Sequence, residues 1–165
     1  GRVGSGSVRS IQAPTPTKKA FGLKPITLAV SVSAKDASLN SRWHANLASP
    51  ASLAGVVQMN GSAAMAPGAG GTSTIVTIDL ANAAPGGEHP WEAHAGQCGA
   101  GMDMGVFGSS DGYKLLKVDG DGRASGSAKV PVRAPETGEY FVVVRASVAN
   151  PETIVACGNL APPTQ

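Results

Sequence analysis

The sequence predicts an all-β protein, built as an antiparallel sandwich or flattened barrel with Greek-key connections. Glycine and proline are abundant, with 22 and 12 residues in a chain of 165, whereas charged residues make up 15% and aromatic residues 4%. Short runs of alternating apolar and polar residues recur between turn residues, and no helical run interrupts them. A chain of this length is expected to enclose one core.

The N-terminal residues differ in composition from the rest of the chain. Residues 1–24 are rich in Gly, Ser, Pro, Thr and Lys, which is typical of an extended arm with little core-forming content. The domain is therefore expected to occupy residues 25–165. Its first strand is predicted at Ile26–Val32, where apolar and polar residues alternate.

The remaining strands are predicted between clusters of turn residues. They are Trp43–Leu47, Ala54–Met65, Ser73–Leu80, Trp91–Ala95, Lys114–Val118, Arg123–Val132, Glu139–Ser147 and Thr153–Gly158. Within the third of these strands, Val76 and Ile78 are expected on one face, with Ile75, Thr77 and Asp79 on the other. The segment from Cys98 to Asp111 is predicted to be a loop. Asp119–Gly122 is predicted to be a hairpin turn, because Asp and Gly adopt positive φ at low cost.

Charge and cysteine content restrict the partners and the compartment. The net charge is +2 and the Lys and Arg residues are scattered, so neither a nucleic acid nor an anionic membrane is expected as partner. No run has the length of a membrane-spanning helix. The two cysteines fit one disulfide, which persists in an oxidising compartment, and two unrelated buried thiols are the alternative. A periplasmic or secreted location is therefore expected, with an export signal upstream.

Two motifs carry a resemblance to a known family. The first is Gly87-Glu88-His89-Pro90-Trp91-Glu92-Ala93-His94, followed by Cys98, and the second is Ala156-Cys157-Gly158. They resemble the copper-ligand strand of Cu/Zn superoxide dismutases (Gly-x-His-Gly-aromatic-His-x-His) and the closing Ala-Cys-Gly of that family. The order of elements from about Leu53 to Leu160 also follows the family. The resemblance implies a Greek-key β-sandwich or flattened barrel of about eight strands, with a Cys98–Cys157 disulfide.

The resemblance also assigns the positions of the metal ligands. His89 falls on the structural histidine of the family, Trp91 on its aromatic position and His94 on its second copper ligand. Glu92 stands where the first copper ligand is expected, and Arg145 stands where the last one is expected. No histidine follows residue 94, although the bridging and zinc ligands should follow the first cysteine. We therefore expect no catalytic residue and no bound metal.

An ion pair between Glu92 and Arg145 is predicted to fill the space that the metal occupies in active relatives. Copper cycling needs several imidazole donors, which one imidazole and a carboxylate do not provide. His94, Glu92 and His44 are nevertheless candidate ligands, because zinc accepts a site of two histidines and a carboxylate.

Two further segments contain possible metal ligands. Met102 and Met104 leave open a thioether site for cuprous copper, with packing as caps over a sheet end as the alternative. Asp119-x-Asp121-Gly122 resembles the start of a calcium loop but lacks the later acidic ligand, so a turn is favoured.

The expected function is that of a non-catalytic, superoxide dismutase-like domain outside the cytoplasm, without a cofactor. Its role would be structural or based on recognition, with an unidentified protein or cell-envelope component as partner, and the N-terminal arm offers a route to a homodimer. Two alternatives stay open. One is a superoxide dismutase with a rearranged copper or zinc site, and the other is a copper-carrying protein that uses His94 and methionines.

Overall fold

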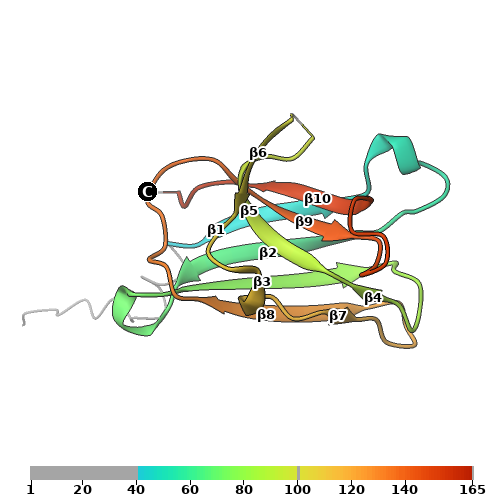
Figure 1. Ribbon diagram of the computed structural model, residues 1–165, viewed down its shortest axis with the longest axis horizontal. Coiled ribbons are helices and arrows are strands. Elements are labelled where there is room, and N and C mark those ends of the chain that lie inside the picture. Colours follow the sequence, from blue (N-terminus) through green and yellow to red (C-terminus); the bar gives the residue numbers. More distant parts are fainter. Residues whose placement is uncertain (1–40, 100, 165) are drawn as a thin grey trace, which may run out of the picture. The chain divides into compact units, whose positions relative to one another are not determined.

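The computed structural model describes residues 41–99 and 101–164. These residues form an antiparallel sheet of eight strands that curls through 215° into a half-barrel, without an α-helix (Figure 1). No helix among them is long and apolar enough to cross a membrane. The predicted strand Ile26–Val32, the arm over residues 1–24 and the domain boundary at residue 25 lie outside the described residues.

The strands of the large sheet follow the order β6-β5-β9-β10-β1-β2-β3-β8. Their bounds are β1 (Trp43–Ala48), β2 (Asn60–Pro67), β3 (Thr74–Ala81), β5 (Trp91–Gln97), β6 (Met102–Val106), β8 (Ala124–Val130), β9 (Tyr140–Arg145) and β10 (Ile154–Leu160). A second, two-stranded sheet pairs β4 (Glu88–His89) with β7 (Leu116–Lys117). Three short 3-10 helices lie in the connections: η1 (Ala51–Leu53), η2 (Ala69–Gly71) and η3 (Ser110–Gly112).

Most of the strands predicted within the described residues are present, but one begins later than predicted, and β4 and β6 were not predicted. The strand predicted at Ala54–Met65 begins only at Asn60, because the chain first turns after η1, where Val56 and Val57 both donate their N–H to Leu53 O at 3.0 Å. The segment predicted as a loop between Cys98 and Asp111 contains β6, which pairs with β5. Every residue of β6 is exposed or half-buried, so its sequence carries no alternating pattern.

The turn at Asp119–Gly122 is present, but it does not form a hairpin. Gly122 N–H donates to Asp119 O at 3.2 Å, and Asp119 Oδ1 accepts the N–H groups of Asp121 and Arg123 at 2.9 Å each. The turn joins β7 to β8, which belong to different sheets. The Asp119 carboxylate is therefore used to close the turn.

The core lies on the inner face of the curled sheet. In β3, Val76, Ile78 and Leu80 are buried while Ile75, Thr77 and Asp79 are half-buried or exposed, as predicted. The largest fully buried side chains include Trp43, Trp91 and Met65. Removal of these apolar side chains from water is the main force that stabilises the sheet.

The predicted disulfide between Cys98 and Cys157 is present. It joins the loop after β5 to β10, although β9 lies between these strands in the sheet. Cys98 N–H also donates to Asn159 Oδ1 at 2.8 Å, which adds a second link between the same two elements. The loop that leads into β6 is thus attached at its base.

Candidate functional site

Strands β5 and β9 bring Glu92, His94 and Arg145 to one face of the sheet. Glu92 pairs with Val143 and His94 with Phe141 in the antiparallel register. Residues two apart along a strand share a face, so Arg145 lies on this face, diagonal to Glu92. The positions that the resemblance assigns to copper ligands are therefore close together on the outer side of the sheet.

The His94 ring is held between two carboxylates. Its Nε2 lies 3.2 Å from Glu92 Oε2, and its Nδ1 lies 2.7 Å from Asp103 Oδ1. The ring is 4% exposed and packs against Phe141 with centroids 5.3 Å apart. A neutral imidazole has a single N–H, so both contacts are hydrogen bonds donated by the ring only when it carries two protons. The imidazole of His94 therefore lies between the carboxylates of Glu92 and Asp103.

Asp103 is the member of this site that sequence analysis missed. It comes from β6, and its Oδ1 also accepts the Gly105 N–H at 2.9 Å. The hydrogen bond from His94 is the largest cause that lowers the pKa of the Asp103 carboxyl below 3.8, opposed by partial burial. The Gly105 N–H and the positive charge of Arg145 lower this pKa further.

The predicted ion pair between Glu92 and Arg145 is not formed within the described part of the chain. Glu92 instead faces His94, and Arg145 Nη1 donates to Pro151 O at 2.8 Å. The physical reason is the register, because Arg145 lies diagonal to Glu92 whereas His94 is two residues away on the same strand and face. The carboxylate therefore pairs with the nearer side chain.

His89 and Trp91, the two residues expected to be structural, make contacts with backbone carbonyl groups. His89 is 8% exposed and its Nδ1 lies 3.0 Å from Arg145 O. Trp91 is buried in the core, donates its Nε1–H to Lys114 O at 2.7 Å and packs edge-on against Tyr113. These contacts attach β4, which carries His89, to β9, and they attach β5, which carries Trp91, to the segment before β7.

The remaining candidate ligands do not join this site. His44 is exposed on β1, and both β9 and β10 separate β1 from β5 in the sheet. Among residues 41–99 and 101–164, no group of three or more His, Cys, Asp and Glu side chains could hold a metal ion. Met102 and Met104 are 50% and 70% exposed on β6, so neither packs as a cap over a sheet end.

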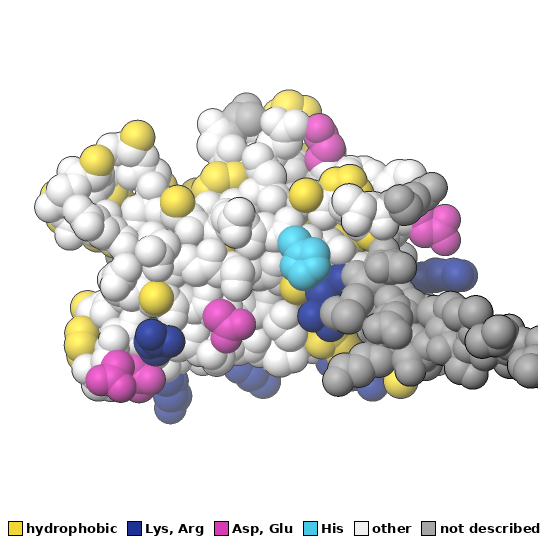
Figure 2. Space-filling view, turned by 180° about the vertical axis from the view of Figure 1, so that it is seen from behind, with side chains coloured by type: hydrophobic (Ala, Val, Ile, Leu, Met, Phe, Trp, Pro, Cys, Tyr) yellow, Lys and Arg dark blue, Asp and Glu magenta, His cyan; other side chains and the backbone are white. Residues whose placement is uncertain are grey.

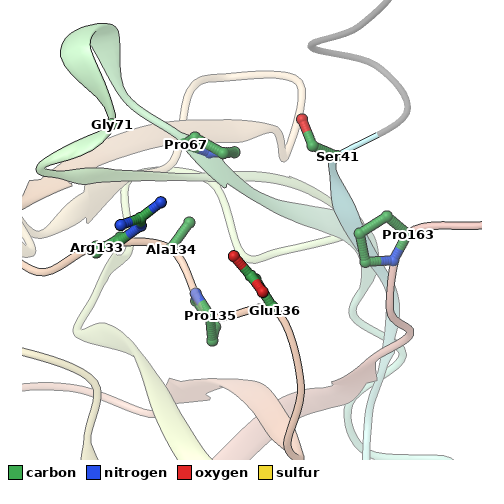
Figure 3. Close-up of a pocket in the computed structure, with 8 residues that line it drawn as sticks. All are labelled: Ser41, Pro67, Gly71, Arg133, Ala134, Pro135, Glu136 and Pro163. Atoms are coloured by element: carbon green, nitrogen blue, oxygen red, sulfur yellow. The ribbon is translucent and has the colours of Figure 1, made fainter.

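A separate cavity of about 380 Å³ lies near the start of β1 and the ends of β2 and β10 (Figure 3). The loop between β8 and β9 contributes its two charged lining residues, Arg133 and Glu136, and prolines form much of the wall. Trp43 Nε1 donates to Pro135 O at 3.1 Å, which fixes this loop to the core. The cavity contains no cluster of catalytic side chains.

The face of the molecule in Figure 2 is largely uncharged. Lys, Arg, Asp and Glu side chains are scattered over its described part, and none of the charge types forms a continuous patch there. A surface of this kind steers charged partners weakly, so recognition there would depend on shape and hydrogen bonds.

No protein-family model and no curated protein matches this chain.

Proposed function

We propose that the chain is a superoxide dismutase-like Greek-key domain that acts outside the cytoplasm without catalysis, through a structural role or through recognition. Its own side chains occupy the position that copper takes in active members of that family. Three features support this proposal: the strand order, the disulfide and the environment of His94.

The strand order supports the Greek-key part of the proposal. A Greek key places three hairpin-connected strands beside a fourth strand that returns over a long connection, in the spatial order 4-1-2-3. Strands β1, β2 and β3 are consecutive neighbours, whereas β3 lies beside β8 and β5 beside β9, so the chain uses the long crossover connections that a Greek key requires. The Cys98–Cys157 bond lies where the resemblance expects it, and such a bond favours an oxidising compartment.

The single observation that carries the non-catalytic part is the engagement of both His94 nitrogens. Each nitrogen faces a different carboxylate, and the two carboxylates lie on different sides of the ring. A metal bound to either nitrogen would displace one carboxylate, and the other carboxylate would remain on the far side of the ring. Arg145 adds a positive charge close enough to influence Asp103. The two carboxylates therefore do not converge with His94 on one ion, and no group of three such side chains in the described part of the chain could hold a metal.

The proposal is tested by metal loading followed by elemental analysis and an assay of superoxide dismutation. The chain incubated with copper and zinc and then desalted is expected to retain neither metal stoichiometrically and to show no dismutation. One equivalent of copper together with rapid dismutation would instead establish the rearranged-site enzyme. Stoichiometric copper without turnover would establish the copper carrier.

A designed gain of binding tests the geometry. The double variant Glu92→His/Arg145→His places three imidazoles on one face of β5 and β9, and we expect it to bind copper(II) with a spectrum typical of several nitrogen ligands. The matched control is Glu88→His/Lys117→His, which replaces the exposed pair whose Lys117 Nζ lies 3.7 Å from Glu88 Oε1 on β4 and β7. Equal copper uptake by both variants would contradict the assignment of the copper position.

A further inference from the structure

The cavity of about 380 Å³ beside the loop between β8 and β9 is lined by one positive and one negative side chain. These two residues, Arg133 and Glu136, are exposed, so both charged groups are accessible to a ligand. Pro67, Pro135 and Pro163 form apolar parts of the wall. Figure 3 shows the guanidinium of Arg133 and the carboxylate of Glu136 pointing from the loop to the same side, towards Pro67. The volume is at the lower end of the range for small-molecule sites.

The two charged groups do not neutralise each other. No ion pair within 4.0 Å joins Arg133 to Glu136 in the described part of the chain, and neither side chain has another ion-pair or hydrogen-bond partner there. A guanidinium and a carboxylate that line one cavity without pairing are complementary to a molecule that carries both charges.

The loop that carries both charges is attached to the core on either side of Arg133. Thr74 Oγ1 donates to Val132 O at 2.7 Å, and Trp43 Nε1 donates to Pro135 O at 3.1 Å. Both donor residues are fully buried, at 0% and 1% exposure. The proline ring at position 135 also restricts the backbone of the loop. The cavity wall is therefore largely preformed, which lowers the entropic cost of binding.

We propose that this cavity binds a small zwitterion of the amino-acid type with an apolar side chain. The ligand carboxylate pairs with Arg133, whose planar donor groups fit a carboxylate, and the ligand ammonium pairs with Glu136. The apolar side chain packs against the prolines and is thereby removed from water. The site goes beyond the proposed non-catalytic role, because it uses neither His94 nor the two carboxylates around that ring.

The test compares three probes that share a phenyl ring and a short carbon chain. At pH 7, L-phenylalanine carries both charges, phenethylamine lacks the carboxylate, and 3-phenylpropanoate lacks the ammonium. Binding to the full chain is measured by NMR titration of the backbone amides and of the Arg133 Nε–H. We expect L-phenylalanine to shift the resonances of the loop between β8 and β9, and each singly charged probe to bind about fivefold more weakly, the effect of one exposed ion pair.

Two variants assign the two charges separately. Arg133→Gln removes the partner of the ligand carboxylate, so L-phenylalanine should then bind no more tightly than phenethylamine. Glu136→Gln removes the partner of the ligand ammonium, so L-phenylalanine should then bind no more tightly than 3-phenylpropanoate. Each variant cancels a different preference, and a general disturbance of the loop would not produce this pattern.

The matched controls are Arg123→Gln and Glu152→Gln, at exposed residues that do not line this cavity. They remove the same charges from the chain and should leave all three affinities unchanged.

The proposal is overturned if millimolar L-phenylalanine causes no shifts in the loop, if either singly charged probe binds as tightly as L-phenylalanine, or if the controls weaken binding as much as the cavity variants. Copper retention and dismutation are measured independently of these titrations. Failure of the ligand site is therefore distinguishable from failure of the non-catalytic role.

Discussion

Asp103 Oδ1 lies 2.7 Å from His94 Nδ1, and this contact joins the exposed edge strand β6 to a buried side chain on the outer face of β5. The Asp103 side chain is 50% exposed and the His94 side chain only 5%. The hydrogen bond therefore links a surface segment to an interior group.

The substitution Asp103→Asn should lower the free energy of unfolding by about 0.5–1 kcal/mol at pH 7, the value for a charged hydrogen bond reduced for solvent screening of a half-exposed group. The folded pKa of Asp103 is below its ordinary value of 3.8, so its contribution is complete above pH 3.8 and is lost as the pH falls through the folded pKa. The difference between the two proteins should therefore shrink below pH 3.8. Urea unfolding at several pH values measures it.

The control for this prediction is Asp121→Asn, at an exposed aspartate on the turn before β8. It should leave stability nearly unchanged over the same pH range. If Asp121→Asn lowered the free energy of unfolding as much as Asp103→Asn, the cause would be the change in net charge rather than the loss of the His94 contact.

Removal of the Cys98–Cys157 disulfide should lower the free energy of unfolding far more than Asp103→Asn does. The Cys98–Cys157 bond spans 59 residues, and closure of a loop of that length is worth about 4 kcal/mol in the loop-entropy model. We expect Cys98→Ser/Cys157→Ser to unfold at correspondingly lower urea concentration, and the unaltered chain to match it in the presence of a strong reductant. Equal midpoints with and without reductant would contradict this expectation.

Tyr113 should make stability depend on pH in the alkaline range. Burial is the largest cause that raises the Tyr113 pKa to about 12, and the Glu92 charge adds to it. Because the folded value exceeds the ordinary value of 10.0, this contribution is complete below pH 10 and is lost as the pH rises towards 12. Thermal unfolding between pH 9 and 12 should show a decline in the unaltered chain that is reduced in Tyr113→Phe.

Tyr113→Phe also removes the hydrogen bond from the tyrosine hydroxyl to Phe107 O at 2.9 Å. A loss of about 1–2 kcal/mol is therefore expected at neutral pH. An identical alkaline decline in both proteins would assign the effect to other groups.

Gly61→Ala should destabilise the sheet at a close contact between β2 and β3. A Cβ at this position would overlap the carbonyl oxygen of Asp79, which is backbone and cannot rotate away. We expect a loss of about 1–3 kcal/mol, as for other overpacked sites. Gly120→Ala is the matched control, because a Cβ at Gly120 meets no atom within 4 Å. Similar unfolding midpoints for the two variants would refute the close approach.

Sequence reasoning predicted strand β3 from the difference in burial between its two faces. The alternation in β3 identified both the strand and its inner face, because only one side of the sheet contacts the core. Strand β6 was not predicted. All of its residues are exposed or half-buried, so apolar and polar residues do not alternate along it. Asp103, which belongs to β6, was missed with it.

The site was predicted in part. Glu92 and His94 were identified from one short motif, since two residues spaced by one position share a face of any strand. The partner of Glu92 was predicted wrongly, because the choice between His94 and Arg145 depends on the register of β5 against β9. Those two strands are separated by more than forty residues in the chain, and local spacing does not define that register.

The sequence by itself predicted that this chain is all-β, since alternation between turn residues is a local pattern, and its family resemblance implied that Cys98 pairs with Cys157; the structure has both features. Only the tertiary structure decided that Asp103 completes the enclosure of His94 and that Nε2 of His89 has no hydrogen-bond partner among residues 41–99 and 101–164. Both outcomes depend on segments far apart in the sequence that the folded sheet brings together. Because both histidines are buried, a hydrogen bond made or left unmade at either ring changes stability more than it would at an exposed group.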